Sequence, residues 1–412
     1  MSTSLAAIVA WAGLVLAIFG VGYGKILRAF WREPVFRHPV LIVESDDWGP
    51  GGEGDARQLE ALADILAERR DRDGRSPVCT LGIVLAVPCG ERMRTGDQSY
   101  VRAMLSDGRF TAVLEAIKRG IGRGVFSPQL HGMEHYWPPA VMAAAARDAE
   151  VKRWLWKPVP RSEDLPSPLQ SRWADAAELP SKPLSAAAIE VAVREETASF
   201  AAIFGAPATV VVPPTFVWSE AVEAAWARAG VRVVVTPGQR YEGRDRAGTV
   251  QAAGGRILNG DAGTDRLVYV VRDDYFEPTR GHRAERALDA LARKTRLGRP
   301  TLLETHRFNF IADPPAADAA IVEFRRMLDL TLDQFPNVRF MSTLELADAI
   351  THRNAKVIET SAARRLHVWL LRLGAISRIR KLAWLTGAIL LAWLLLLLTA
   401  SGTPARMAAS RQ

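Results

Sequence analysis

Short apolar segments alternate with segments of helical pattern through most of this chain, and this alternation is the strongest constraint on its fold. The strand-like segments are residues 40–43, 79–87, 125–130, 209–212, 231–235, 267–271, 301–305 and 338–341. Helical patterns lie between several of them, at residues 56–69, 186–203, 220–229 and 316–334. Such alternation indicates an α/β fold with a parallel sheet, and the number of strands favours a closed or nearly closed barrel. The predicted domain covers residues 38–353.

The composition allows one large core with appendages, because 49% of the 412 residues are hydrophobic and 24% are charged. A net charge of +8 is compatible with nucleic acid or with an anionic membrane surface as a partner. The basic residues gather beside apolar segments, which favours the membrane, and we predict no nucleic-acid partner. The only cysteines, Cys79 and Cys89, indicate no disulfide framework and are expected in the core.

Both ends of the chain carry an uncharged apolar segment long enough to cross a bilayer, residues 5–23 and residues 382–400. A signal peptide is the alternative for the first segment. Its start is uncharged, however, and its basic residues follow the apolar run, which is unlike a signal peptide. We therefore predict a transmembrane anchor over residues 1–24 and a transmembrane helix over residues 382–400.

Basic residues flank the inner side of both predicted spans. By the positive-inside rule these flanks are cytoplasmic, which predicts a cell (inner) membrane protein with two spans and a cytoplasmic catalytic domain. Residues 357–381 also carry apolar residues at helical spacing, which predicts an amphipathic juxtamembrane helix. That helix lies either on anionic headgroups or against its own domain. The flanking residues are Lys25, Arg28, Arg32 and Arg37, then Arg364, Arg365, Arg372, Arg378, Arg380 and Lys381.

One stretch interrupts the alternation. Residues 152–183 contain six prolines together with Trp154, Trp156 and Trp173. A long Pro-rich connection is usually a lid, a binding loop or a linker, and a plain surface excursion is the alternative.

Residues that suit a metal site follow three of the predicted strands. Asp46 and Asp47 end the first strand, where an acidic turn that caps the next helix is the alternative. His131 and His135 follow residues 125–130, and on one helical turn they would point the same way. His306 ends residues 301–305. One carboxylate and two imidazoles form a three-ligand zinc site with an open position for water, whose pKa such a metal lowers to about 7.

The order of these motifs resembles the polysaccharide deacetylases, carbohydrate esterase family four. That family has an Asp-Asp pair, a His-x-x-x-His motif, a Pro-containing loop and a late His, in this order. The corresponding residues here are Asp46 and Asp47, His131 and His135, residues 212–216, and His306, and residues 335–347 are similar to the family's ending. The resemblance implies a distorted (β/α) barrel of fewer than eight units over residues 38–352.

The resemblance also implies a role for each motif residue. Asp47, His131 and His135 would hold a divalent metal, most plausibly Zn²⁺. Asp46 would be the general base, and His306 would be the acid that protonates the departing amine. Thr215 would direct its backbone N–H toward the oxyanion.

The chain departs from the family at several positions. Val212 stands where the family has an Arg that orients the base, and Asp273 or Asp274 would be the Asp that usually pairs with that Arg. Gly132 replaces a Ser or Thr, and the late motif, residues 303–306, is one residue longer than usual.

Several other residues beside the motifs have two interpretations. Arg307 and Asn309 contact substrate or lie in a surface loop. The aromatic residues near the motifs stack on sugars or pack in the core. They are Trp48, Trp137, Phe216 and Trp218.

We therefore expect a membrane-anchored, zinc-dependent deacetylase that hydrolyses N-acyl groups from sugars of a glycan or a lipid-linked glycan precursor. One alternative is a non-catalytic glycan-binding pseudo-enzyme of the same fold, favoured by the missing Arg at Val212. The other is a glycoside hydrolase on a related barrel, which would draw its two carboxylates from Glu44, Glu134 and Glu304.

Overall fold

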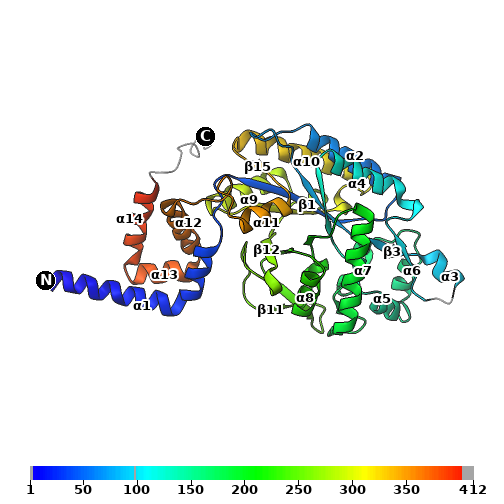
Figure 1. Cartoon of the computed structure of the whole chain (residues 1–412), viewed down its shortest axis with the longest axis horizontal. Helices are drawn as coiled ribbons and strands as arrows, with labels where there is room; N and C mark the ends of the chain where they lie inside the picture. Colours follow the sequence, from blue (N-terminus) through cyan, green and yellow to red (C-terminus); the bar gives the residue numbers. More distant parts are fainter. Residues whose placement is uncertain (1–2, 97–98, 401–412) are drawn as a thin grey trace.

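A computed structural model describes residues 3–96 and 99–400, and its centre is a parallel sheet surrounded by helices (Figure 1). Eight strands follow one another in the order β12-β9-β8-β5-β2-β1-β14-β13. Their bounds are β1 Val40–Trp48, β2 Cys79–Ile83, β5 Phe126–Leu130, β8 Val210–Val211, β9 Val233–Thr236, β12 Val268–Val271, β13 Asp274–Tyr275 and β14 Thr301–His306. A short strand, β15 (Arg339–Phe340), pairs with the first two residues of β1. The predicted α/β class is confirmed.

The sheet forms a half-barrel, consistent with the distorted barrel that the motifs imply. The edge strands β12 and β13 do not pair with each other among the described residues, so the barrel stays open there. Only Arg272 and Asp273 separate these two strands in the chain. The open seam is therefore crossed by a two-residue connection.

Amphipathic helices cover the outside of the sheet. In α2 (Glu53–Ala67) the buried side chains recur every three or four residues, as in Leu59, Leu62 and Leu66. The helix α7 (Ala186–Phe204) begins where Ser185 Oγ accepts the Ala188 N–H and ends at Gly205, whose φ is +70°. The remaining helices of this layer are α4 Thr111–Gly122, α8 Glu220–Arg228, α9 Ala284–Arg296, α10 Pro314–Gln334 and α11 Thr343–Thr351.

The Pro- and Trp-rich insertion, residues 152–183, consists of short turns rather than long helices. It continues α6 (Ala149–Leu155) through the 3-10 turns η2 (Ser162–Asp164) and η3 (Ser167–Gln170) to the small hairpin of β6 (Ala174–Asp175) and β7 (Lys182–Pro183). Trp154, Leu165 and Leu169 are buried in one cluster with Tyr136 and Val141, which lie just beyond the histidine motif. The insertion is thus packed against the region of the predicted site.

Four more short strands and two short helices complete the domain. They are the hairpins β3 (Ala86–Pro88) with β4 (Arg102–Met104) and β10 (Arg240–Arg244) with β11 (Val250–Ala253), and the helices α3 (Gly90–Thr95) and α5 (Pro138–Ala145).

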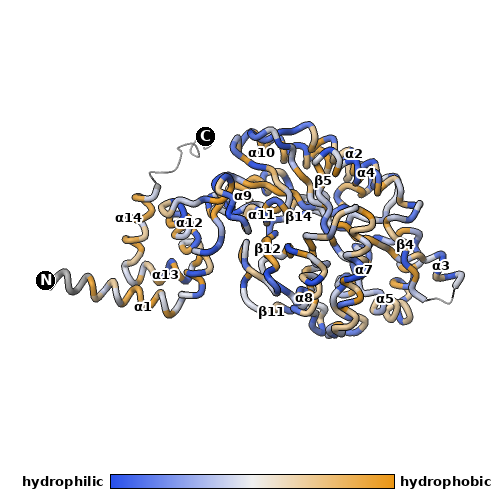
Figure 2. Tube along the Cα trace, in the orientation of Figure 1, coloured by the Kyte–Doolittle hydropathy of each residue, from blue (hydrophilic) through white to orange (hydrophobic). Residues whose placement is uncertain are grey.

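The amino-terminal helix α1 (Thr3–Arg32) stands outside the domain and is largely apolar (Figure 2). Residues 9–32 are long and apolar enough to cross a membrane, a property that a signal sequence near the amino terminus shares. This supports the first predicted span by length and composition.

The predicted second span, residues 382–400, is not one straight helix. The chain forms α13 (Ser377–Leu385) and α14 (Ala388–Ala400), which meet at 110° beside Gly387, whose φ is +71°. The 13 residues of α14 cover about 20 Å, less than the roughly 30 Å hydrocarbon core. A second span is therefore not confirmed, and the tail with Arg406 and Arg411 lies outside the described residues.

The predicted juxtamembrane helix, residues 357–381, comprises α12 (Ala362–Gly374) and the first part of α13. Arg372 of α12 is buried, and its guanidinium donates to the carbonyls of five residues at 2.8–3.2 Å. These residues are Phe30, Glu33, Pro34, Leu297 and Gly298. One face of α12 therefore packs on α1 and on the segment just before β14.

Candidate active site

The carboxyl ends of β1 and β14 bring the predicted base and acid together. The register of these strands places Asp46 opposite His306. We expected β1 to end at the acidic pair, but it continues to Trp48, and its register with β2 shifts between Ser45 and Trp48. Asp47 has a φ of +68° at this irregularity. Successive side chains of a regular strand point to opposite faces, so a bulge here re-aims the second carboxylate.

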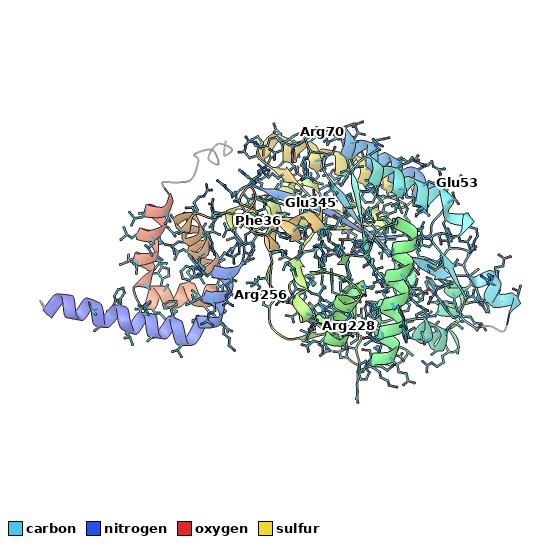
Figure 3. The ribbon with its side chains drawn as sticks, in the orientation of Figure 1. Phe36, Glu53, Arg70, Arg228, Arg256 and Glu345 are labelled. Carbon is cyan, nitrogen blue, oxygen red and sulfur yellow. The ribbon has the colours of Figure 1, made fainter. Side chains whose placement is uncertain are left out.

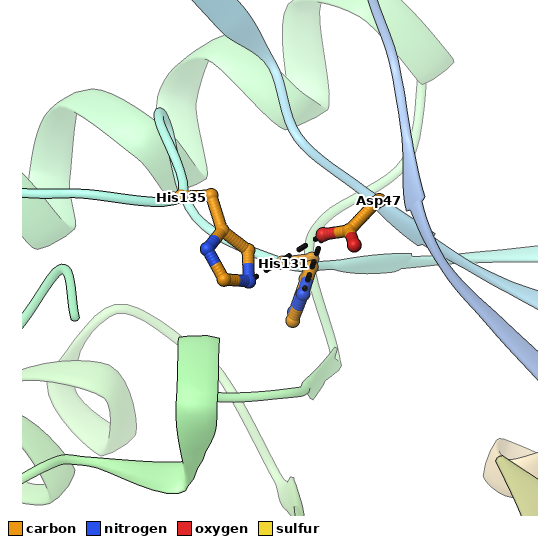
Figure 4. Close-up of side chains that lie close together, drawn as sticks. All are labelled: Asp47, His131 and His135. Atoms are coloured by element: carbon orange, nitrogen blue, oxygen red, sulfur yellow. Dashed lines mark ion pairs between the residues drawn. The ribbon is translucent and has the colours of Figure 1, made fainter. Parts of the chain in front are cut away.

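Asp47 lies beside both predicted histidine ligands (Figure 4). Its Oδ1 atom is 3.5 Å from His131 Nε2 and 3.4 Å from His135 Nε2. All three side chains are buried. The prediction that the histidines share a helical turn is wrong, because they lie in the loop that follows β5. Gly132 shapes that loop with a φ of +94°, and an added Cβ would lie 2.7 Å from the Glu134 carbonyl oxygen. This explains why no Ser or Thr stands there.

The geometry of these three side chains fits a divalent metal. Two ligands about 2.1 Å from a tetrahedral ion are about 3.4 Å apart, which is the spacing found here. His131 Nδ1 lies 2.8 Å from the Val212 carbonyl oxygen, an acceptor, so a neutral His131 keeps its Nε2 lone pair for a metal. Burial lowers the pKa of His135 to about 4, which keeps that ring neutral at pH 7. The buried Asp47 Oδ1 has no hydrogen-bond donor among the described residues.

We predict that replacing Asp47, His131 or His135 by Ala abolishes metal binding, because a three-ligand site loses a third of its donors. The purified protein should contain roughly one zinc per chain by elemental analysis, and each variant close to none. The control is His352→Ala. The His352 ring is exposed, and its hydrogen-bond partner among the described residues is the Asp348 carbonyl of the preceding helix. Equal metal content in the wild type and in His131→Ala would refute the ligand assignment.

Arg272 holds the predicted base, and the sequence prediction missed it. Its guanidinium donates to Asp46 Oδ2 at 2.6 Å and to Glu44 Oε2 at 2.9 Å, and Nε lies 3.2 Å from Glu304 Oε2. Burial opposes the charge of Asp46, but the attraction of Arg272, together with that of His131 and His306, outweighs it and holds the pKa of Asp46 below its ordinary value. Burial instead raises the pKa of Glu44 and of Glu304. The pKa of Asp46 is therefore shifted in the opposite direction to those of Glu44 and Glu304.

Gly82 leaves room for the Asp46 carboxylate because it has no side chain. The unpartnered Asp46 Oδ1 lies over Gly82 of β2, where an added Cβ would approach it to 2.3 Å. Only a residue without a side chain fits that position, and Asp46 Oδ1 has no hydrogen-bond partner among the described residues.

The arginine expected at Val212 is thus supplied by the connection between β12 and β13. Val212 contributes its carbonyl to His131 instead. Neither Asp273 nor Asp274 forms an ion pair with Arg272 among the described residues. The Asp274 carboxylate pairs with Arg293 at 2.5 Å, and the Asp273 carboxylate pairs with Lys294. The sequence signal for this role was an Arg at the end of a predicted strand, followed directly by two acidic residues.

We predict that Arg272→Met destabilises folding by about 3–5 kcal/mol at neutral pH, because three buried carboxylates lose their counter-charge. In the variant the pKa of Asp46 is no longer lowered and the raised pKa values of Glu44 and Glu304 rise further, so the folded state gains protons and recovers stability as the pH falls. The gap to wild type in chemical denaturation should therefore shrink from pH 8 to pH 5. Arg244→Met is the control, because buried Arg244 bonds to Ser171 Oγ and the Gly248 carbonyl but to no described carboxylate. A gap for Arg272→Met that does not change with pH would contradict this account.

His306 is held in a charged form by carboxylates. Its Nδ1 lies 2.6 Å from Glu277 Oε1, and its Nε2 lies 3.5 Å from Glu304 Oε1. Burial disfavours the charge, but the Glu277 hydrogen bond and the charges of Asp47 and Glu304 outweigh it and raise the pKa of His306 to about 10. A protonated imidazole in this position is a proton donor.

Asn309 does not lie in a surface loop, which was one of its two interpretations. It is fully buried and donates to the Glu277 carboxylate. His282 Nδ1 accepts the Glu277 backbone N–H at 3.0 Å. Asn309 and His282 therefore position the carboxylate that holds His306.

A small cavity opens beside Asp47 and His135, and the insertion forms part of its wall. Pro160 and Ser162 of the insertion line it together with Tyr136 and Arg307. Arg307 is buried and forms long ion pairs, 3.6 Å to Glu163 of the insertion and 3.9 Å to Asp55. The insertion thus forms part of the cavity wall and is not a plain surface excursion, and Arg307 is not a surface residue.

The loop with Thr215 is strained. Thr215 and Phe216 have φ values of 52° and 55°, a region that side chains with a Cβ rarely adopt. Thr215 Oγ1 lies 2.9 Å from Ser171 Oγ, and its backbone N–H donates no hydrogen bond to any described residue. A free N–H is compatible with the oxyanion role, which stays a prediction.

The aromatic residues near the motifs are mostly structural. Trp48 and Trp218 are fully buried, so they pack in the core and do not form sugar-stacking walls. The half-buried Phe216 ring lies 5.3 Å from the guanidinium carbon of Arg272. The half-buried Trp137 precedes α5.

Two of the carboxylates proposed for glycoside hydrolysis are closed off. Glu44 and Glu134 are fully buried. Glu44 is bound by Arg272 and Thr343, and Glu134 is bound by Arg172 and Arg102 at 2.8 Å each. Neither carboxylate is available to a sugar.

No family model matches the chain, and no curated protein matches it in sequence. Solved structures do match. A family 4 carbohydrate esterase from Streptomyces lividans is 11% identical over 73% of this chain and 91% of its own, with a TM-score of 0.34. A CE4 family pseudoenzyme from Bacillus anthracis is 11% identical over 76% and 66%, with a TM-score of 0.36.

A 4-α-glucanotransferase from Thermococcus litoralis is 13% identical over 77% of this chain, with a TM-score of 0.39, and this chain spans 40% of its length. A family 4 carbohydrate esterase and a peptidoglycan deacetylase are thus among the similar structures. At these identities and TM-scores the likeness carries no argument about function, which rests on the residues of the site.

Proposed function

We propose that this chain is a metal-dependent deacetylase that hydrolyses N-acyl groups from sugars of a glycan. The observation that carries the proposal is the arrangement of acidic and histidine side chains at one edge of the sheet. Asp46, fixed by Arg272, and His306, fixed by Glu277, both lie next to the Asp47, His131 and His135 cluster. An ionised carboxylate and a protonated imidazole next to a ligand set are the groups that amide hydrolysis needs.

Each side chain has one task in this proposal. A divalent ion, most plausibly Zn²⁺, would supply Lewis-acid chemistry to the acyl carbonyl and to water. Asp46 accepts a proton from the attacking water through its free Oδ1. The Thr215 N–H faces the oxygen on which negative charge develops. His306 donates its proton to the nitrogen that leaves as the sugar amine.

The position of Arg272 weakens the pseudo-enzyme alternative. Its main support was Val212 in place of the arginine that orients the base, and Arg272 donates to Asp46 at 2.6 Å instead. The glycoside hydrolase alternative loses Glu44 and Glu134 as exposed carboxylates.

We predict that Asp46→Asn retains metal but lowers turnover by about 10²-fold or more, because the amide keeps the shape and cannot accept the proton. His306→Ala should likewise retain metal and lose rate. Acetate released from an N-acetylglucosamine oligomer is measured beside the metal content of each variant. Unchanged turnover in Asp46→Asn would make this residue structural, and metal loss in His306→Ala would make it a fourth ligand.

We further propose that the protein is held in the cell (inner) membrane with its catalytic domain in the cytoplasm. The length and composition of α1 and the basic residues that follow its apolar run support this. The bend between α13 and α14 leaves the second span as part of the proposal only.

We predict that a cysteine at exposed Arg246, in the turn after β10, is protected from an impermeant maleimide in intact spheroplasts and is labelled after lysis. Cys79 and Cys89 are buried and should not interfere. A cysteine at Ser410 should be labelled without lysis if the carboxyl terminus crosses the membrane. Labelling of Arg246→Cys in intact spheroplasts would place the domain outside.

A further inference from the structure

The membrane-facing helices and the candidate site lie at opposite ends of the same strands. In a parallel sheet all strands point one way, so their amino ends form one edge and their carboxyl ends the other. Asp46, Asp47 and His306 lie at the carboxyl ends of β1 and β14. The connections to α1 and α12 lie at the amino ends of these strands.

Several contacts fix the helices at the amino edge. The Phe36 N–H, four residues before β1, donates to the Gly298 carbonyl, three residues before β14. Arg299 forms a two-point ion pair with Glu33 at 2.7 and 2.8 Å. Phe36 also forms a bridge with Ile358, from which the chain continues into α12. Both terminal segments therefore leave the domain at this edge.

Arg372 makes the attachment rigid. Its side chain is fully buried and joins the end of α1, the segment before β14 and α12 through the five carbonyls described above, and it lies 3.2 Å from Glu33 Oε2. Breaking these contacts would leave buried carbonyl groups without donors. The terminal helices are thus fixed to the domain. The domain cannot turn its other edge toward them without breaking the contacts of Arg372.

The height of the sheet separates the two edges. Asp46 lies six residues beyond Val40, about 20 Å at roughly 3.3 Å per residue. In Figure 3, Phe36 and Arg256 lie on the side of the terminal helices, whereas Glu53, the first residue of α2 after β1, lies on the opposite side.

Exposed apolar surface is confined almost entirely to the terminal helices. Among the described residues, the large exposed hydrophobic side chains outside α1, α13 and α14 are Val191, Tyr275 and Val322. The terminal helices expose residues such as Val21, Leu385 and Leu390 at 72–90%. An apolar surface of this kind can bind a lipid bilayer. The edge of the sheet that carries the site has no comparable apolar surface among the described residues.

We propose that the acyl sugar acted on is presented away from the membrane, in a soluble glycan or far along a glycan chain, and not as a sugar joined directly to a membrane lipid. This rests on the proposed deacetylase function and narrows its substrate class. It favours the glycan over the short lipid-linked precursor that the sequence left open. The arrangement holds whichever side of the membrane the domain occupies.

The full-length protein in phosphatidylglycerol and phosphatidylethanolamine vesicles tests the proposal with three substrates. These are a soluble N-acetylglucosamine oligomer, a polyprenyl-linked N-acetyl monosaccharide in the same vesicles, and the same lipid carrying a long N-acetylated glycan. The first and third should be deacetylated, and the second at least about tenfold more slowly, because a substrate that cannot span the distance has almost no effective concentration at the site. Equal rates for the second and first substrates would overturn the proposal. Loss of all three activities would instead refute the deacetylase function.

A measurement without turnover separates the two questions. A fluorophore at Glu53→Cys reports the site edge, and one at Arg256→Cys reports the anchor edge, because Leu258 packs with Phe30 and Leu373. Both positions are exposed, and the native cysteines are buried. Lipids with a nitroxide headgroup should quench the label at position 256 and leave the label at position 53 unquenched. Equal quenching of both would place the site edge at the membrane and overturn the proposal.

Discussion

The buried guanidinium of Arg272 is the interaction on which the candidate site depends. Glu44, Asp46 and Glu304 converge at the carboxyl ends of β1 and β14, and burying an uncompensated carboxylate costs several kcal/mol. The positive charge of Arg272 stabilises these three acids next to one another. Arg272 contributes to the lowered pKa of Asp46, whereas burial raises the pKa of Glu44 and of Glu304. The pKa values of adjacent carboxyl groups are thereby shifted in opposite directions, which distinguishes a base from its surroundings.

The open side of the barrel provides room for that arginine. In a closed barrel, β12 and β13 would be hydrogen-bonded neighbours, and the two-residue connection between them could not exist. Here the chain crosses the seam through Arg272, whose backbone N–H donates to the Thr236 carbonyl at 2.8 Å and whose side chain reaches the acids of β1 and β14. The distortion of the fold and the electrostatics of the site therefore have one structural cause.

The direction of the sheet gives the molecule two different ends. Strand β1 begins soon after α1, and the last strand, β15, pairs with the first residues of β1. The chain accordingly enters and leaves at the amino edge, where Arg372 and Glu33 secure the apolar helices. Every candidate catalytic group lies at the carboxyl edge, where the loops and the insertion are free to shape a cavity.

The sequence by itself determined the strand and helix alternation, the burial of Cys79 and Cys89, and the candidate ligands Asp47, His131 and His135, which the structure brings together. Local periodicity and motif spacing carry this information, because a strand or a ligand triad is set by residue types along the chain. Only the tertiary structure decided the role of Arg272, the burial of Trp48, Trp218 and Asn309, and the bend between α13 and α14. These depend on partners 30 to more than 200 residues away, such as the Arg272–Glu44 pair, and chain order does not reveal which distant groups meet at a sheet edge.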